Sequence, residues 1–144
     1  MTTIRTMTLD DYDAVIDLMK QTPGVSIREA DSRDAVARYL DRNPGLSFVA
    51  CAEDTIVGCV MSGHDGKRGY LQHVVVRVDF RKQGIGRALV KQCVDGLAAL
   101  GIEKYHLDVL KNNDAAARYW AGMGWKLRTD IDRYSFINSD NPNA

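Results

Sequence analysis

The sequence lacks several features that mark particular classes of protein. No apolar run reaches the length that spans a membrane, and the segment Met1–Arg5 shows no charged-then-apolar signal pattern. The three cysteines, Cys51, Cys59 and Cys93, have no metal-ligand spacing, and an odd number suits no disulfide framework. Each lies among apolar neighbours, so buried thiols are expected. We therefore expect a cytoplasmic protein with no metal site and no membrane contact.

An excess of charge of either sign is also missing. The 144 residues include 19 Lys and Arg and 19 Asp and Glu, which give a formal net charge of zero. A nucleic-acid-binding domain normally carries a basic excess, so nucleic acid is not expected as a partner. The length and a hydrophobic content of 45% suit one domain with its own core. We expect that domain at residues 1–138, followed by a polar tail at 139–144.

The hydrophobic residues change between helical and extended spacing along the chain. Helical spacing follows Thr8, where Asp11 completes an approximate capping box, and it returns at Val36–Leu40. Three extended runs follow as an antiparallel meander, and a later apolar stripe from Ile85 to Leu100 predicts a long helix that ends at Gly101. The predicted strands are 4–7, 47–52, 55–62, 70–78, 105–110, 125–127 and 134–137, and the predicted helices begin at Thr8, after Arg33, after Gly84 and at Asn113 or Asp114.

The segment Arg81–Gly86 joins the strand that ends at Val78 to the long helix. Gly84 and Gly86 permit backbone conformations and close approaches that side chains forbid. A helix N-terminus offers unpaired N–H groups and a partial positive charge, which favour an anion. The segment therefore indicates either a phosphate-binding loop or a tight turn among solvated bases. The basic residues around it, with Asp79 the one acid among them, are Arg77, Arg81, Lys82, Arg87 and Lys91.

Two other phosphate-binding motifs fit this segment less well. A P-loop requires Gly-Lys-Ser/Thr, whereas Gly86 is followed by Arg87 and Ala88. A dinucleotide-binding fingerprint requires a third glycine where Leu89 stands, and it belongs to a strand-helix-strand repeat. Here an antiparallel meander precedes the loop. A nucleotide-binding module is therefore the less favoured alternative.

Two segments resemble the signature of the GNAT superfamily of acyl-CoA-dependent N-acyltransferases. Val76–Leu89 contains the pattern Arg/Gln-x-x-Gly-x-Gly/Ala of the acyl-CoA loop. Downstream, Asn113–Ala116 resembles the Asn-x-x-Ala motif of that family, and Gly124–Trp125 resembles its closing Gly-Phe/Tyr. The order of elements matches from Ile4 to about Ile137. The resemblance implies an α/β fold of the α+β type, with a mixed, mostly antiparallel sheet of about seven strands and about four helices, splayed at a central parallel strand pair.

The resemblance also implies acetyl-CoA as co-substrate. Backbone N–H groups of Lys82–Arg87 would bind the pyrophosphate, and Val74–Val76 would pair with the pantetheine arm as if it were another strand. Asn113 and the helix after it would flank the thioester. The residues assigned to acetyl-CoA are Val74, Val75, Val76, Arg81, Lys82, Gln83, Gly84, Ile85, Gly86, Arg87, Ala88, Asn113, Ala116 and Trp120.

The acid that would protonate the leaving thiolate departs from the pattern of the family. The position seven residues after Asn113, where a tyrosine is usual, holds Trp120. An indole N–H donates a hydrogen bond but is no acid at neutral pH. Tyr119 is adjacent, but one helical residue turns its side chain by about 100°. Three readings stay open: the thiolate leaves without an acid, the N–H of Trp120 stabilises it, or a local shift places Tyr119.

The base that would accept the proton of the amine is also unsettled by the sequence. Relatives that have a base often carry it on the strand before the loop, at positions that correspond to Tyr70 and Gln72. Gln72 cannot take a proton, whereas the adjacent His73 has the right chemistry. Strand alternation turns His73 away from the side of Gln72 unless a bulge re-aims it. A water chain is the alternative, and His64 and His106 have weaker claims.

The function implied by the resemblance is acetyl transfer from acetyl-CoA to a primary amine of a small molecule or peptide, by direct attack in a ternary complex. The alternative is a non-catalytic acyl-CoA sensor or regulatory protein on the same fold, which the missing acid at Trp120 motivates. Family members are often dimers, so a homodimer is compatible with the resemblance. Acceptors usually bind between the first two helices. The mixed charges of that loop, at Arg28, Glu29, Asp31 and Arg33, are expected to be solvated surface.

Overall fold

Five strands and four α-helices make up the fold of this chain, described by a computed structural model that covers all 144 residues. The chain divides into two units, Met1–Leu107 and Asp108–Ala144. The first unit contains β1 (Thr2–Thr6), α1 (Tyr12–Lys20), α2 (Arg33–Arg42), β2 (Phe48–Ala52), β3 (Thr55–His64), β4 (Gly69–Val76), α3 (Ile85–Ala99) and β5 (Tyr105–His106), and the second contains α4 (Asp114–Gly122).

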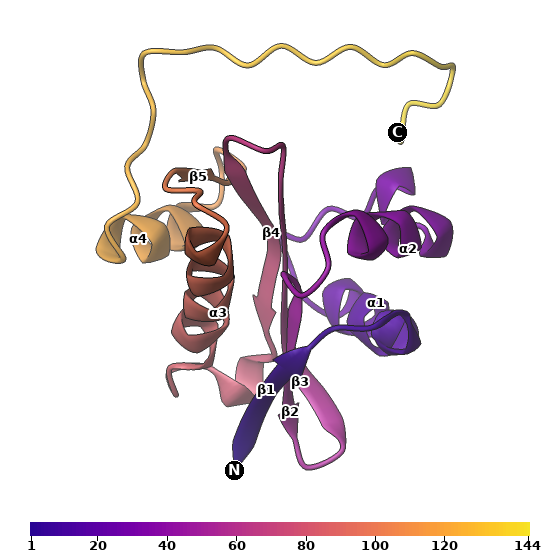
Figure 1. Cartoon of the computed structure of the whole chain (residues 1–144), viewed down its shortest axis with the longest axis vertical. Coiled ribbons are helices and arrows are strands. Elements are labelled where there is room, and N and C mark those ends of the chain that lie inside the picture. Colours follow the sequence, from indigo (N-terminus) through magenta and orange to yellow (C-terminus); the bar gives the residue numbers. More distant parts are fainter. The chain divides into compact units, whose positions relative to one another are not determined.

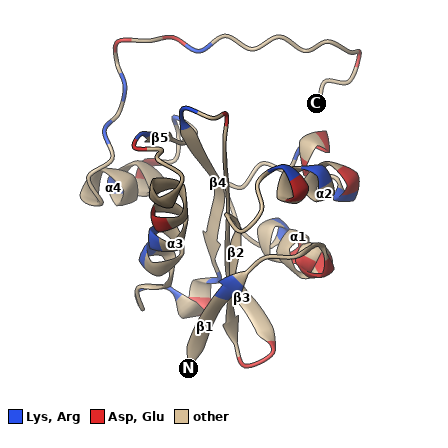
Figure 2. Ribbon diagram, viewed as in Figure 1, with Lys and Arg blue, Asp and Glu red and all other residues tan.

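The strands of the first unit form one mixed sheet in the order β1-β2-β3-β4-β5. The first four strands pair antiparallel, and β5 joins β4 in parallel. Helices α1 and α2 lie on one side of this sheet and α3 on the other (Figure 1). Strands β2, β3 and β4 carry no Lys, Arg, Asp or Glu, and the charged residues lie on helices, connecting segments, β1 and the segment after α4 (Figure 2). This pattern fits a sheet that is covered on both faces.

The apolar faces of the helices form the core on the two sides of the sheet. On α1, Val15, Ile16 and Met19 are buried, as their helical spacing predicts. The stripe of α3 is buried at Ile85, Leu89, Cys93 and Leu97, but Leu100 is exposed because the helix ends at Ala99 and Gly101 turns with a φ of 82°. The three cysteines are buried free thiols, as expected. No helix combines the length and the apolar character that a membrane crossing requires.

The predicted number of about seven strands is wrong, because the structure has five. The segments 125–127 and 134–137, expected as a closing hairpin, form no strand, and β5 is two residues long rather than 105–110. A strand exists only where its N–H and C=O groups pair with another strand, and the segments after Gly124 pair with none. Their apolar side chains are exposed: Leu127 by 88%, Tyr134 by 91% and Phe136 by 87%. The parallel pair of β4 and β5 therefore lies at one edge of the sheet, not at its centre.

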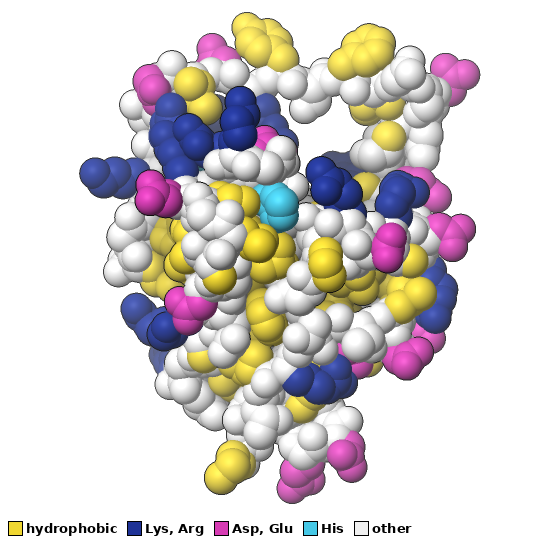
Figure 3. Space-filling model, in the orientation of Figure 1, with side chains coloured by type: hydrophobic (Ala, Val, Ile, Leu, Met, Phe, Trp, Pro, Cys, Tyr) yellow, Lys and Arg dark blue, Asp and Glu magenta, His cyan; other side chains and the backbone are white.

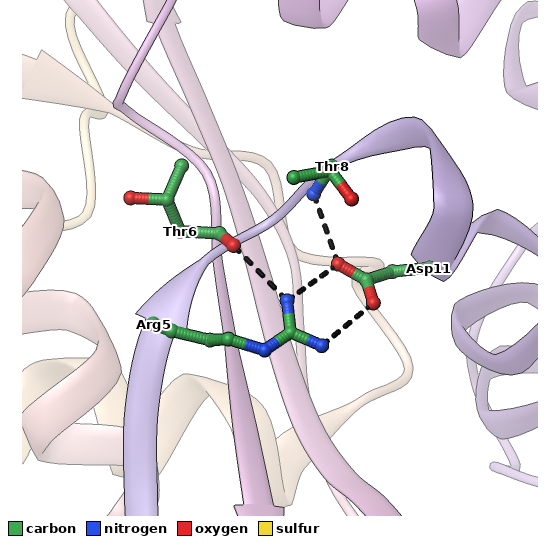
Figure 4. Close-up of polar contacts among 4 residues, drawn as sticks. All are labelled: Arg5, Thr6, Thr8 and Asp11. Carbon is green, nitrogen blue, oxygen red and sulfur yellow. Dashed lines mark hydrogen bonds and ion pairs between the residues drawn. The ribbon is translucent and has the colours of Figure 1, made fainter.

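A buried carboxylate connects β1 to the turn that precedes α1. Two nitrogens of Arg5 donate to the two carboxylate oxygens of Asp11, each at 2.8 Å, and the N–H of Thr8 donates to the same carboxylate at 2.9 Å (Figure 4). Asp11 closes a short 3₁₀ turn, Leu9–Asp11, that leads into α1. The hydrogen bonds from Arg5 are the main reason that the pKa of Asp11 lies below its ordinary value.

This contact predicts the effect of Asp11→Asn on stability. The change leaves Arg5 without its bidentate partner, and we expect a loss of about 1–3 kcal/mol in the free energy of unfolding at pH 7, measured by urea denaturation. Because the folded-state pKa of Asp11 is lowered, its contribution is present above the ordinary pKa of 3.8 and is lost as the pH falls through the folded-state value. Asp10→Asn, at an exposed neighbour, is the matched control. Equal stabilities of Asp11→Asn and the unaltered protein at pH 7 would contradict this account.

Candidate active site

One edge of β4 has no strand partner over most of its length. On its other edge, β3 pairs with β4 from His64↔Gly69 to Gly58↔Val76. On the open edge, β5 pairs only with Gly69 and Tyr70. The backbone of Leu71–Val76 on that side therefore faces no other strand. An extended ligand with amide groups can bind such an edge by adding itself as a strand.

A bulge interrupts β4 opposite β3. Val75 pairs with Cys59 and Gln72 pairs with Met61, so two residues, His73 and Val74, lie opposite one residue of β3. His73 takes a φ of 53°, in the left-handed region, and its carbonyl accepts a hydrogen bond from the thiol of Cys59 at 3.4 Å. The bulge breaks the strand alternation that would fix the direction of the His73 side chain.

The imidazole of His73 reaches the turn between α1 and α2. Its Nε2 lies 2.8 Å from Oδ1 of Asp31, and the two side chains are 15% and 9% exposed. Asp31 closes the 3₁₀ turn Glu29–Asp31 just before α2. Its other oxygen accepts the N–H of Arg28 at 2.9 Å, and its carbonyl accepts the hydroxyl of Tyr12 at 2.6 Å. The histidine and the carboxylate are thus held together by four separate segments of chain.

The expectation that Asp31 is solvated is wrong. Asp31 is only 7% exposed, whereas Arg28, Glu29 and Arg33 lie at the surface as expected. Burial alone would raise the pKa of the Asp31 carboxyl, but hydrogen bonds from His73 and from the N–H of Arg28 outweigh burial and hold this pKa below its usual value. Asp31 is therefore a buried carboxylate that orients the imidazole.

A pocket of about 460 Å³ opens beside this pair, between α2 and the sheet. Tyr39 lines it, and its hydroxyl is buried without a hydrogen-bond partner. Burial raises the pKa of Tyr39 to about 12, so the hydroxyl keeps its proton at neutral pH. The pocket is also lined by Ala30, Asp31, Ala35, Val36, Arg38, Arg42, Asn43, Met61 and Gln72.

The glycine-rich loop begins where β4 ends. A 3₁₀ turn, Val78–Phe80, leads into it, Lys82 has a φ of 63°, and Gly84 has a φ of 82° as the residue before α3. No side chain caps the first turn of α3, and a Cβ added at Gly84 would meet nothing within 4 Å. The N–H groups at this helix end thus have no side-chain cap and the space beside Gly84 is open, which suits an anion. Ile85, at the start of α3, is buried and anchors the loop.

The basic residues around this loop are not equally available. Arg77 forms an ion pair with Asp79 at 2.7 Å and lies over the ring of Phe80, and Lys91 pairs with Asp95 at 2.7 Å. Arg81 donates from Nε to the carbonyl of Val76 at 3.0 Å, which ties the loop to the end of β4. The exposed bases without a partner here are Lys82 and Arg87. The positive charge at the helix end is therefore smaller than the sequence indicates.

The remaining predicted residues belong to the second unit. The side chain of Asn113 accepts the N–H of Ala116 at 3.1 Å, so Asn113 caps α4 as its position predicts. The rings of Tyr119 and Trp120 meet edge to face at 5.2 Å, and Trp120 meets Trp125 in the same way at 5.2 Å. The structure thus groups Val74–Val76, His73 and Arg81–Ala88 in one unit, and Asn113, Ala116, Tyr119 and Trp120 in the other.

Two parts of this site were missed in the sequence. The role of Asp31 had a local signal, since Arg28-x-x-Asp31 repeats the spacing of Thr8-x-x-Asp11, and both aspartates close a 3₁₀ turn. The lining of the pocket by Tyr39 had no such signal, because an aromatic residue at helical spacing is equally typical of a core.

Comparisons with known proteins place this geometry in a family. The model of the acetyltransferase (GNAT) family matches residues 12–125. An acetyltransferase of Pectobacterium atrosepticum is 38% identical over 112 residues, which cover 78% of this chain and 79% of the relative.

Two solved structures share the fold. A PaiA N-acetyltransferase from Thermoplasma acidophilum, in complex with coenzyme A, matches with a TM-score of 0.81 at 18% identity, over 92% of this chain and 93% of that one. AAC(6')-Iy, in complex with the bisubstrate analogue CoA-S-monomethyl-acetylneamine, matches with a TM-score of 0.74 at 19% identity, over 95% of this chain and 99% of that one. The family match, the close relative and the shared fold agree, and the chain belongs to the acetyltransferase (GNAT) family.

Proposed function

We propose that this chain is an N-acetyltransferase that moves an acetyl group from acetyl-CoA to a primary amine of a small molecule or peptide. The observation that carries the proposal is the continuity of the unpaired edge of β4 with an uncapped helix end at Gly84. An extended amide chain that ends in a phosphate anion matches both features together. The family and the named acetyltransferase relative support it.

The residues of this unit fit acetyl-CoA in two places. The groups from Lys82 to Ala88, on the loop and the first turn of α3, would hold the pyrophosphate, because their N–H groups lack a cap and Gly84 leaves the approach open. Val74, Val75 and Val76 would hydrogen-bond the pantetheine arm along the open edge. When bound, acetyl-CoA supplies the acyl group as an activated thioester.

At the thioester end, the assignments rest on the family motif. Asn113, Ala116 and Trp120 are assigned there by their place in the Asn-x-x-Ala segment. The side chain of Asn113 is already used as the cap of α4, which leaves the N–H of Trp120 as a donor for a departing thiolate. Tyr119 is 41% exposed and packs its ring against Trp120. A hydrogen-bond donor lowers the cost of the thiolate even where no proton is transferred.

For the proton of the attacking amine, we assign His73 as the base. The bulge turns His73 towards Asp31, and the carboxylate accepts from Nε2–H, which leaves Nδ1 with its lone pair. A buried carboxylate on one ring nitrogen fixes the tautomer and stabilises the protonated imidazole. In the proposed reaction the amine nitrogen bonds to the acyl carbon, the C–S bond breaks, and His73 accepts the proton that the amine loses.

If the chain is an N-acetyltransferase, the pure protein should bind acetyl-CoA and release coenzyme A when a suitable amine is present. Calorimetry should show saturable binding of acetyl-CoA, and a thiol-detecting assay over a panel of primary amines should show release of free coenzyme A with at least one of them. Binding without release for any amine would favour the non-catalytic sensor. No binding of CoA or acetyl-CoA at millimolar concentration would refute the proposal.

The loop assignment predicts that Gly86→Glu abolishes acetyl-CoA binding. The change places an anion where the pyrophosphate would lie, and we expect affinity to fall by roughly 100-fold or more in calorimetry. Gln92→Glu adds the same charge to an exposed position further along α3 and should leave the affinity unchanged. A folded Gly86→Glu protein with normal affinity would show that the loop does not hold the phosphates.

The base assignment predicts a specific loss in His73→Asn. Asparagine tolerates the left-handed backbone of this bulge, so the change removes the imidazole with little strain. We expect kcat to fall by roughly 10²–10⁴-fold with acetyl-CoA affinity retained. His64→Asn, at the last residue of β3, is the matched control. An unchanged kcat in His73→Asn would assign the role of base to a water chain.

A further inference from the structure

One face of α2 places two arginines in the pocket beside the His73–Asp31 pair. Ala35, Arg38, Tyr39 and Arg42 line it at spacings of three and four residues, which lie on one side of a helix. Across the pocket are Met61 of β3 and Gln72 of β4. A volume of about 460 Å³ suits a small molecule.

Neither arginine has a partner in the protein. Arg38 and Arg42 are exposed, and no ion pair or side-chain hydrogen bond engages either of them. Like charges four residues apart disfavour a helix, so the pair costs the fold stability. Basic side chains reach the surface over α2, with acidic ones beside them (Figure 3). The acids of α2 itself, Asp34 and Asp41, do not line the pocket.

Asp31 is the one acid that lines the pocket, and its oxygens already accept hydrogen bonds from the protein. Both oxygens of Asp31 are occupied, one by His73 and one by the N–H of Arg28, and its single negative charge is outnumbered by the two arginines that line the same pocket. The pocket therefore has a net positive character in a chain with no net charge. Such a field attracts an anion and repels a polycation.

The hydroxyl of Tyr39 is buried behind the wall of the pocket. Buried polar atoms in proteins almost always have a hydrogen-bond partner, and this hydroxyl has none. Gln72 lies near enough to offset part of the effect of burial on the pKa of Tyr39, but it does not complete a hydrogen bond. The hydroxyl is therefore an unsatisfied group of the α2 packing, and the two arginines are the groups that are open to a ligand.

We propose that this pocket binds the acceptor and that the acceptor is a small amine which also carries an anionic group, a carboxylate or a phosphate, held by Arg38 and Arg42. The inference rests on the acetyl transfer proposed above and adds the chemical class of the acceptor. The anion would sit on the α2 side, and the amine on the side of Asp31 and Gln72, next to His73. Polycationic amines of the aminoglycoside type are disfavoured by the same two arginines.

The test is a comparison of matched amines by ligand-observed NMR titration, with and without coenzyme A. The anionic probes are β-alanine, 4-aminobutyrate, 6-aminohexanoate and O-phosphoethanolamine, and the neutral partners are the three ω-amino amides and ethanolamine. The three amino acids differ in chain length, so their relative affinities report the distance in the pocket between the amine site and the anion site. Comparison with O-phosphoethanolamine shows whether the anion site prefers a carboxylate or a phosphate. We expect at least one anionic probe to bind roughly tenfold or more tightly than its neutral partner, and this preference to weaken with added salt.

Variants of the two arginines test whether they cause the preference for anionic probes. Arg38→Gln with Arg42→Gln should erase the preference and leave acetyl-CoA affinity unchanged, whereas Lys20→Gln, an exposed base on α1, should preserve it. Equal binding of charged and neutral partners, no binding of any anionic probe, or a preference that survives in the double variant would overturn the inference.

Turnover separates this inference from the proposed function. An anionic probe that binds through the arginines but yields no acetylated product with acetyl-CoA leaves the pocket assignment standing and refutes the transfer reaction. Acetylation of kanamycin or of the neutral amines, at rates that the double variant does not change, supports the transfer reaction and refutes the anionic acceptor.

Discussion

The bulge at His73 and Val74 determines how the rest of the candidate site is built. One extra residue in β4 lets the imidazole leave the direction set by strand alternation and meet a carboxylate from another part of the chain. That contact keeps Asp31 ionised in a buried position and ties the start of α2 to the sheet. The wall of the pocket formed by α2 is thereby held against β4. A regular strand at this point would leave Asp31 without the partner that makes its burial tolerable.

The sheet and the loop follow from local patterns, which is why the sequence predicts them well. Val74–Val76 marks a buried strand, and the glycines after Arg81 mark a turn into a helix, because β-branched runs and glycines act on their own immediate backbone. The caps at Asn113 and Gly101 are predictable for the same reason. Each of these elements needs few distant partners to form.

The bulge, the burial of Asp31 and the missing strands depend on partners far away in the sequence. No pattern in β4 alone shows that β3 is one residue short opposite it. The extended pattern of 134–137 resembles a strand, but only a neighbour with free N–H and C=O groups can make it one. The sequence likewise does not predict that the hydroxyl of Tyr39 is buried without a hydrogen-bond partner, because this depends on how α2 packs on the sheet. Register and packing are properties of pairs of segments, and a single segment does not encode them.

The two aspartates that close 3₁₀ turns offer a comparison within one molecule. Asp11 and Asp31 occupy the same position in equivalent turns before a helix, and each accepts a backbone N–H at 2.9 Å. Asp11 accepts hydrogen bonds from two nitrogens of Arg5, whose charge is permanent. Asp31 is held by an imidazole through one nitrogen. The single imidazole contact is the weaker of the two, but the ring keeps a second nitrogen, which the proposed reaction uses as the base. The same local turn therefore occurs twice in this chain: once it joins β1 to α1, and once it orients the proposed base.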